Sequence, residues 1–230
     1  MATAGTLLRE YAEVVFVAAL LALFAKTFVF EGFEIPTPSM EDNLLVGDHI
    51  IVNKFVYAPH RGPWARFLPH KDPQPGDVFV FKSPETPERD FVKRVIGAPS
   101  DEVEIDEKEL YRNGWSVEER YVTFKDPAVY PPEGPEPEAL RRRDNTASFT
   151  VPAGRYFALG DNRDDSRDSR FWGLVPGELV KGQALLIYWS YDVRAARSFP
   201  GPAAPLRRFL DTAIHFFGRT RWERSFQQIP

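Results

Sequence analysis

The sequence predicts a mostly β protein, built of antiparallel strands, behind one N-terminal transmembrane helix. Short runs of β-branched and aromatic residues are separated by turn signals such as Asn113-Gly114 and Pro176-Gly177, which is typical of an all-β domain. One apolar segment near the N-terminus has the length of a bilayer-spanning helix. With 230 residues, of which 43% are hydrophobic, the chain is one large domain or a domain with an insertion.

The apolar segment opens the chain. Residues 14–25 are uncharged, and the twenty residues 11–30 are enough to span a bilayer. Glu13 and Lys26 lie near its ends, where long charged side chains can reach the membrane interface. A cleaved signal peptide is the alternative. However, residues 1–13 contain one arginine and two glutamates and so lack the basic region that begins such a peptide.

The predicted strands lie after this segment. They cover residues 50–52, 78–81, 91–96, 103–105, 156–159 and 184–189. Residues 127–137 contain five prolines and no packing pattern, which indicates a loop within an insertion at about residues 110–150. We therefore expect residues 1–30 to be an anchor and residues 31–200 to form a β-rich domain that carries the insertion.

Residues 201–230 form a basic, amphipathic C-terminal tail. From Pro205 onward the sequence predicts a helix with apolar residues at helical spacing, namely Leu206, Leu210, Ala213 and Phe217. Five arginines against one aspartate and one glutamate leave the tail basic. Two interpretations stay open, because the apolar stripe could pack on the domain or the helix could lie on an anionic membrane surface.

The composition argues against several kinds of site. The net charge of −4 makes nucleic acid no obvious partner. Because cysteine is absent, the chain has no disulfide and no thiol nucleophile. The four histidines show no triad signature and no His-x-x-x-His spacing for zinc. Neither Asp-Thr-Gly nor Asp-Ser-Gly occurs, which argues against an aspartic protease.

Residues 160–173 are the most informative stretch of the chain. Between two glycines they contain four aspartates, three arginines and two final aromatic residues. A solvated turn with weak ion pairs is the simpler explanation for such a composition. The preceding run 156–159, however, has the pattern of a buried strand that delivers the loop to a fixed place. A rigid strand followed by a polar loop is a common way to build a functional site.

Two further pairs of segments accompany this loop: FEIPTPSM at 33–40 with LLVGD at 44–48, and GDVFVFK at 76–82 with DFVKRVIG at 90–97. With the loop, and in the same order, they resemble bacterial type I signal peptidase, a family of Ser-Lys proteases. The similarity covers residues 31–191 and is interrupted at 110–149. It implies coiled antiparallel β-sheets and a membrane-bound serine endopeptidase that removes N-terminal signal peptides from exported preproteins.

The resemblance also implies where the protein works. The anchor would be retained as a single pass through the bacterial inner membrane, with the catalytic domain on the extracytoplasmic side. The implied partners are the signal peptides of preproteins and the lipid bilayer. No metal or organic cofactor is implied.

A lysine can activate a serine only if it is neutral. Its reference pKa of about 10.4 leaves about one lysine in a few thousand neutral at pH 7, and burial lowers that pKa by several units. In a strand over residues 90–96, Phe91, Lys93 and Val95 share one face, so large apolar groups flank Lys93. Arg94 points to the other face. A lysine that snorkels from a half-exposed strand is the alternative.

The resemblance assigns roles to individual residues. Ser39 is placed as the nucleophile and Lys93 as the general base. Thr37 matches the oxyanion-hole hydroxyl, and Ser166 matches a serine that hydrogen-bonds the lysine amine. Pro38 stands where the family commonly has glycine, so the shape of this loop differs, while the Ser39 N–H donor is retained.

The remaining site residues fall into two groups. Asp161, Asp168 and Arg170 are predicted to form an ion-pair framework for the site rather than to transfer protons. In the family the substrate binds extended, and two apolar pockets receive the side chains one and three residues before the cut. By motif position the first pocket is lined by Ile35, Pro36, Met40, Leu44 and Phe91, and the second by Phe33, Ile35, Val80 and Val92.

Two other functions stay open from the sequence. One is another Ser-Lys peptidase, such as a self-cleaving repressor-type protease or an enzyme that processes pili. The apolar N-terminal segment argues against the repressor. The other is an inactive, membrane-tethered β module that binds peptides by strand addition. The combination of Ser39, Lys93 and Ser166 argues against that module, because peptide binding does not need all three.

Overall fold

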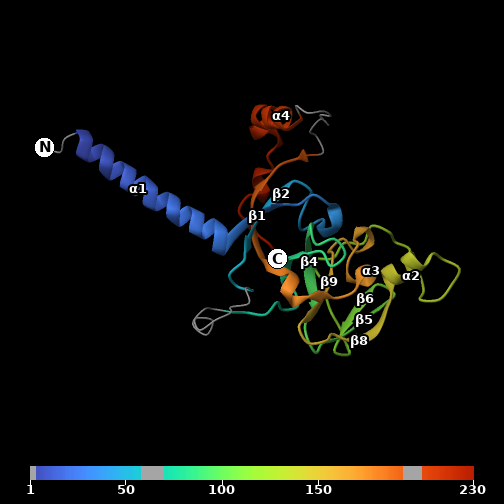
Figure 1. Cartoon of the computed structure of the whole chain (residues 1–230). Helices are drawn as coiled ribbons and strands as arrows, with labels where there is room; N and C mark the ends of the chain where they lie inside the picture. Colours follow the sequence, from blue (N-terminus) through green and yellow to red (C-terminus); the bar gives the residue numbers. More distant parts are fainter. Residues whose placement is uncertain (1–3, 58–69, 194–203) are drawn as a thin grey trace.

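The computed structural model describes residues 4–57, 70–193 and 204–230. Helix α1 (Ala4–Phe24) extends away from the body of the protein and continues as a π-helical turn over Ala25–Val29 (Figure 1). The stretch Arg9–Val29 is long and apolar enough to cross a membrane, and none of it is buried against the body. The predicted N-terminal helix is therefore confirmed as an element.

Most of the body is one curled antiparallel sheet of eight strands. Its order is β1-β2-β11-β3-β4-β9-β10, and β12 pairs with β11. All of these pairs are antiparallel. The strands are β1 (Phe30–Glu34), β2 (Asp48–Asn53), β3 (Val78–Lys82), β4 (Asp90–Gly97), β9 (Arg155–Leu159), β10 (Val175–Pro176), β11 (Val180–Ser190) and β12 (Gln227–Gln228).

A second antiparallel sheet of four strands lies at the end of the body away from α1 (Figure 1). Its order is β7-β6-β5-β8, with β7 (Trp115–Ser116), β6 (Glu109–Arg112), β5 (Glu102–Asp106) and β8 (Thr146–Thr150). Helix α2 (Glu138–Asp144) precedes β8, and the short helix α3 (Ser169–Trp172) follows the charged loop. The predicted fold class, mostly β with coiled antiparallel sheets behind an N-terminal helix, is confirmed.

Strand β3 lies in the middle of the larger sheet and is buried on both faces. Val78 and Val80 pack into one cluster of buried side chains, and Phe79 and Phe81 pack into a second, because successive residues of a strand point to opposite faces. A third cluster joins β4 and β9 to the smaller sheet. The neighbouring strand β4, which carries Lys93, is therefore held between packed layers.

The residues after α4 (Ala204–Arg219) pack against the larger sheet. A turn over Trp222–Arg224 leads into β12, which pairs with β11. The carboxylate of Asp48, fully buried at the start of β2, accepts hydrogen bonds from Arg224 and from the hydroxyl of Ser190. The helix predicted from Pro205 onward is present, and the segment behind it is fixed to the sheet.

Candidate active site

Ser39 lies on a single turn of 3₁₀ helix, Pro38–Met40, that follows β1. Thr37 is extended, and Pro38 begins the turn at a position where its fixed φ is tolerated and its missing N–H is not needed. Ser39 is 8% exposed, and its hydroxyl lies 3.4 Å from the hydroxyl of Thr37. The candidate nucleophile is thus nearly buried beside a second hydroxyl group.

Lys93 reaches this serine from β4. Its amine donates hydrogen bonds to Ser39 Oγ at 2.6 Å and to the carbonyl of Val92 at 3.1 Å. The amine also lies 5.8 Å from the centre of the Phe91 ring, and Lys93 is only 4% exposed. Phe91 and Lys93 therefore share a face of β4, as the alternation of the strand predicts, and Lys93 does not snorkel into solvent.

Burial changes the protonation of this lysine. It lowers the pKa of Lys93 to about 8, although the carboxylates of Asp168 and Asp161 act in the opposite direction. At pH 7, about one Lys93 amine in ten is then neutral, which is far more than for a lysine in water. A neutral amine in contact with Ser39 Oγ can accept the proton of that hydroxyl.

The loop after β9 holds the serine from the other side. Asn162, which is fully buried, donates its backbone N–H to the carbonyl of Ser39 at 3.2 Å and its side-chain amide to the carbonyl of Pro38 at 3.1 Å. Asn162 is not among the site residues predicted from the sequence. No local pattern marks it, because its role depends on two segments more than 120 residues apart.

Ser166 lies in the same loop and is buried. The structure contains no hydrogen bond between Ser166 and Lys93, whose amine donates to Ser39 and to Val92 instead. Ser166 and the Ser39 carbonyl both lie against Gly160, so closely that a Cβ atom on Gly160 would overlap with each of them. The orienting role of Ser166 stays a prediction.

Two buried ion pairs underlie the site. Asp161 accepts hydrogen bonds from Arg94, at 2.9 and 2.7 Å, and both side chains are 1% exposed. Asp168 accepts hydrogen bonds from Arg170 at 2.8 Å. Burial alone would raise the pKa of Asp168, but the charge and hydrogen bonds of Arg170, together with the hydrogen bond from the Gly160 N–H and the Ser166 side chain, hold this pKa below its ordinary value. The partner of Asp161 is thus Arg94, the neighbour of Lys93 on the opposite face of β4.

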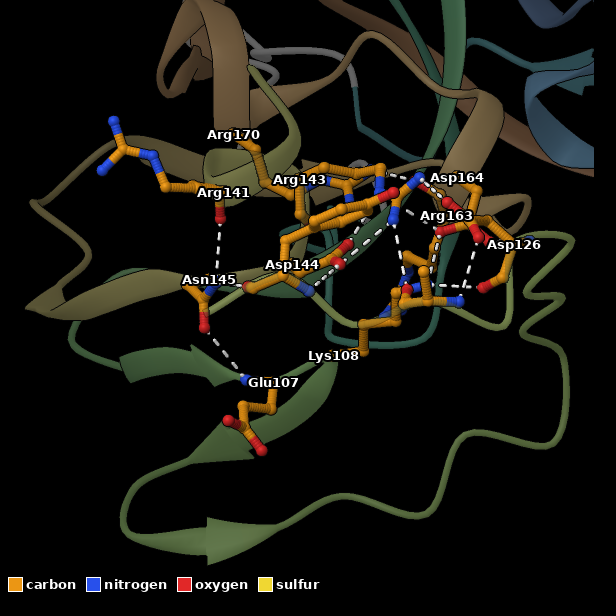
Figure 2. A network of polar contacts seen from close by, with 12 residues as sticks. Glu107, Lys108, Asp126, Arg141, Arg143, Asp144, Asn145, Arg163, Asp164 and Arg170 are labelled. Atoms are coloured by element: carbon orange, nitrogen blue, oxygen red, sulfur yellow. Dashed lines mark hydrogen bonds and ion pairs between the residues drawn. The ribbon is translucent and has the colours of Figure 1, made fainter. Parts of the chain in front are cut away.

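A network of charged residues connects the loop to the insertion (Figure 2). Arg170 donates to the carbonyls of Arg143 and Arg163, at 2.6 and 2.7 Å. Asp164 forms ion pairs with Lys108 at 3.0 Å and with Arg143 at 3.4 Å. Within the described parts of the chain, no cluster of three or more histidines and acidic residues could hold a metal ion. The network is a set of ion pairs by which the insertion supports the loop.

A groove of about 680 Å³ leads to Ser39 and Lys93. Residues 33–40, from the end of β1 and the connection that follows it, and residues 89–93, at the start of β4, line it together with Asp165 and Arg167. Most of the predicted substrate-binding residues line it, namely Phe33, Ile35, Pro36, Met40, Phe91 and Val92. Leu44 and Val80 lie elsewhere. Both are fully buried in the cluster beneath the groove, in which Ile35 and Met40 also take part.

Comparisons with known proteins identify the family of the chain. The family model described as Signal peptidase, peptidase S26, matches residues 8–189. A signal peptidase I of Pseudomonas aeruginosa is 37% identical over 209 residues, which cover 80% of this chain and 74% of that protein. A signal peptidase I of Aquifex aeolicus is 33% identical over 245 residues, which cover 86% of this chain and 90% of that protein.

A crystal structure of a signal peptidase I from Enterococcus faecalis is 34% identical in sequence and covers 49% of this chain and 97% of that chain, at a TM-score of 0.37. At that TM-score the assignment depends on the family model and on the sequence identities, both of which extend over most of the chain. The chain belongs to the signal peptidase family, peptidase S26, and is a serine hydrolase of that family.

Proposed function

We propose that this chain is a membrane-anchored enzyme that cleaves signal peptides from preproteins with Ser39 as nucleophile and Lys93 as general base. The observation that carries the proposal is the 2.6 Å hydrogen bond between the Lys93 amine and Ser39 Oγ. A nucleophile and its base must lie within such a distance of each other. The lowered pKa of Lys93 supplies the neutral amine that this role requires.

The reaction follows from this arrangement. Ser39 Oγ attacks the scissile carbonyl while the Lys93 amine takes the hydroxyl proton, and an acyl-enzyme forms when Lys93 returns that proton to the leaving amine. Water then attacks the ester while Lys93 takes its proton, and Lys93 returns this proton to Ser39 Oγ as the acyl bond breaks and the carboxylic acid product leaves. The Ser39 N–H and the Thr37 hydroxyl stabilise the oxyanion, and such a donor typically contributes about 10²–10³-fold in kcat. The buried pairs of Asp161 and Asp168 hold the loop in place.

The pH dependence tests the role of Lys93. Only its neutral amine can accept a proton, so kcat/KM should rise with pH through an apparent pKa of about 8. Well below this pH, kcat/KM should fall about tenfold for each pH unit, because the neutral fraction falls by that factor. Initial rates on a short signal-peptide substrate would measure this. A profile that stays flat on both sides of pH 8 would contradict a titrating lysine.

The proposed binding of substrate in the groove can be tested by its preference for small side chains. The side chain just before the cut meets Ile35 and Met40, which are almost fully buried, and these are supported by Leu44 and Val80 beneath them. Overfilling a packed apolar site costs about 1–3 kcal/mol. We therefore expect alanine or glycine before the cut to be preferred over leucine by about tenfold to a hundredfold in kcat/KM.

A peptide series would measure this preference by varying the three residues before the cut one at a time. The third residue before the cut should accept alanine and also valine, and the residue between should vary freely, since neighbours on an extended chain face opposite sides. Equal cleavage after leucine or phenylalanine would refute the assignment of the groove.

The side of the membrane on which the catalytic domain lies can be tested with protease. In this proposal residues 1–30 hold the enzyme in the bacterial inner membrane, and residues 31–200, with the insertion at about 110–150, form the catalytic domain outside the cytoplasm. In sealed, inverted inner-membrane vesicles, added protease should leave the catalytic domain intact until detergent opens the vesicles. A tag fused to the N-terminus should be digested in the same sample. Digestion of the catalytic domain in sealed vesicles would reverse the orientation.

One experiment tests the proposed function directly. The detergent-solubilised full chain is incubated with a preprotein, and the new N-terminus of the product is sequenced. We expect a single cut at the end of the signal peptide. The same preparation of Ser39→Ala should give no product. Cleavage at many unrelated sites, or product formation by Ser39→Ala, would contradict the proposal.

A further inference from the structure

Helix α4 turns a partly polar face toward the body of the protein and leaves its apolar face exposed. Its half-buried side chains include the polar residues Asp211, Thr212 and Arg219. Its apolar side chains point outward, and Ile214 and Phe217 are 77% and 80% exposed. Leu206, Phe209 and Leu210 are exposed as well. A helix that packed on a hydrophobic core would show the opposite arrangement. Among the described residues, only Trp222 and Phe216 contact this apolar face through their rings, at Phe217, and the face is otherwise exposed.

The position of the helix is nevertheless fixed. Phe216 is its main apolar contact with the body, with ring centres 5.8 Å from Trp189 on β11 and 5.6 Å from Trp222. The N–H of the Trp189 ring donates to the hydroxyl of Thr220, just after the helix. The outward direction of the apolar face is therefore set by packing at its edge.

Three arginines at the end of α4 and just after it are paired within the protein. Arg219 pairs with Asp211 at 2.8 Å, and Arg221 and Arg224 both reach the buried carboxylate of Asp48. Attraction of these three arginines to anionic lipid is thus not what the structure offers. The exposed feature is the apolar face, which favours insertion between lipid chains over binding to their head groups.

The helix also lies at the same end of the molecule as the proposed membrane anchor α1. Both α1 and α4 project from the end of the body formed by β1 and β2, and the smaller sheet lies at the opposite end (Figure 1). Trp222 and Phe226, which follow α4, are exposed there too. A second copy of the chain is a weaker candidate, because five side chains on one helix are few compared with the roughly 20–30 residues per side of a stable interface.

We propose that α4 lies in the surface of the same bilayer that α1 spans, with Leu206, Phe209, Leu210, Ile214 and Phe217 inserted into the lipid. This contact rests on the proposed anchor and goes beyond it, because it adds a second, in-plane attachment. A single spanning helix lets the domain rotate and tilt, whereas two attachments fix the β1–β2 end, and with it the groove, toward the membrane.

Because the chain has no cysteine, single labels can test this in the full-length protein. We would label Phe217→Cys with an environment-sensitive fluorophore and reconstitute the protein in vesicles of phosphatidylethanolamine and phosphatidylglycerol. The matched control is His215→Cys, because residue 215 lies about 200° from residue 217 around the same helix. His215 is also exposed, and both variants keep the Phe216 ring and its contact with Trp189. Phe217→Cys gives up only the ring contacts of Phe217 with Phe216 and Trp222. Leu20→Cys marks the spanning helix.

Lipids with a doxyl group on the acyl chain should quench most of the emission of the labels at 217 and 20, and little of that at 215. Iodide in the buffer should quench the label at 215 alone. Quenching by lipid at 20 but not at 217 would overturn this inference and leave the anchor standing. Lack of lipid quenching at both 20 and 217 would also remove the anchor. The label at 217 could instead be protected from iodide without being quenched by lipid, and show energy transfer between differently labelled copies. That result would identify a second copy of the chain, and not the bilayer, as the partner of this face.

Discussion

Replacing either Ser39 or Lys93 with alanine should remove almost all turnover, by a factor on the order of 10⁴ or more, and the double variant should be little slower than either single variant. The reason is that the hydroxyl and the amine act as one unit across their 2.6 Å hydrogen bond, so losing one partner makes the other useless. Single-turnover cleavage of a preprotein by the purified full chain would measure this. Thermal unfolding would confirm that each variant folds.

The sharper variant is Lys93→Arg. Arginine keeps the positive charge and much of the length of lysine, but it does not deprotonate at any pH of interest. We therefore expect it to be as inactive as the alanine variant. Lys82→Arg is the matched control, because Lys82 lies on the neighbouring strand β3, is exposed and does not line the groove. Substantial turnover by Lys93→Arg, or equal loss in both variants, would refute the general-base assignment.

Local patterns in the sequence were enough to find the strands that contain a run of apolar residues or an alternation of apolar and polar residues. The runs at 50–52, 78–81, 91–96, 103–105, 156–159 and 184–189 all lie within observed strands. Strand β1 was missed because it contains two glutamates and a glycine and directly follows the apolar helix. Strand β8 was missed because its residues are mostly polar and largely exposed. Their pairing with β2 and β5 supplies the stability that their own sequences do not indicate.

At the site, too, local sequence patterns predicted some features and not others. Alternation along β4 places Lys93 beside Phe91 and sends Arg94 to the other face, where it meets Asp161. Motif position, in contrast, does not tell which layer a residue occupies. Leu44 and Val80 were predicted to line the groove and lie fully buried beneath it. Their proposed effect on the substrate is therefore indirect, through the residues that they support.

The tail contributes to the site in a way that no short motif reveals. Arg224 donates to the carbonyl of Asn43, and Arg221 donates to the carbonyl of Val46. Both arginines also reach Asp48. The connection that carries Ser39 is thus held by Asn162 on one side and by the residues after α4 on the other. These contacts join segments more than 170 residues apart, so only the tertiary structure could show them.

The second large effect is expected at Gly160, the point where these segments come closest. A methyl group there would overlap with the Ser39 carbonyl oxygen and with the side chain of Ser166. The carbonyl belongs to the backbone and cannot rotate away, so Gly160→Ala should displace Ser39 relative to Lys93. A shift of about 1 Å in a reacting group costs about 10²-fold, and we expect a loss of that size in kcat/KM.

Gly218→Ala is the matched control for this variant, because a Cβ atom at that position meets no atom within 4 Å. It should keep full activity, while Gly160→Ala loses activity and retains a cooperative unfolding transition. A further variant separates the two overlaps. Adding Ser166→Gly to Gly160→Ala removes the clash with the side chain but leaves the clash with the Ser39 carbonyl, so activity should stay well below that of Ser166→Gly alone. If the second change restored full activity, the Ser39 backbone would not be the limiting contact, and the close approach of the two loops would not explain why this position carries glycine.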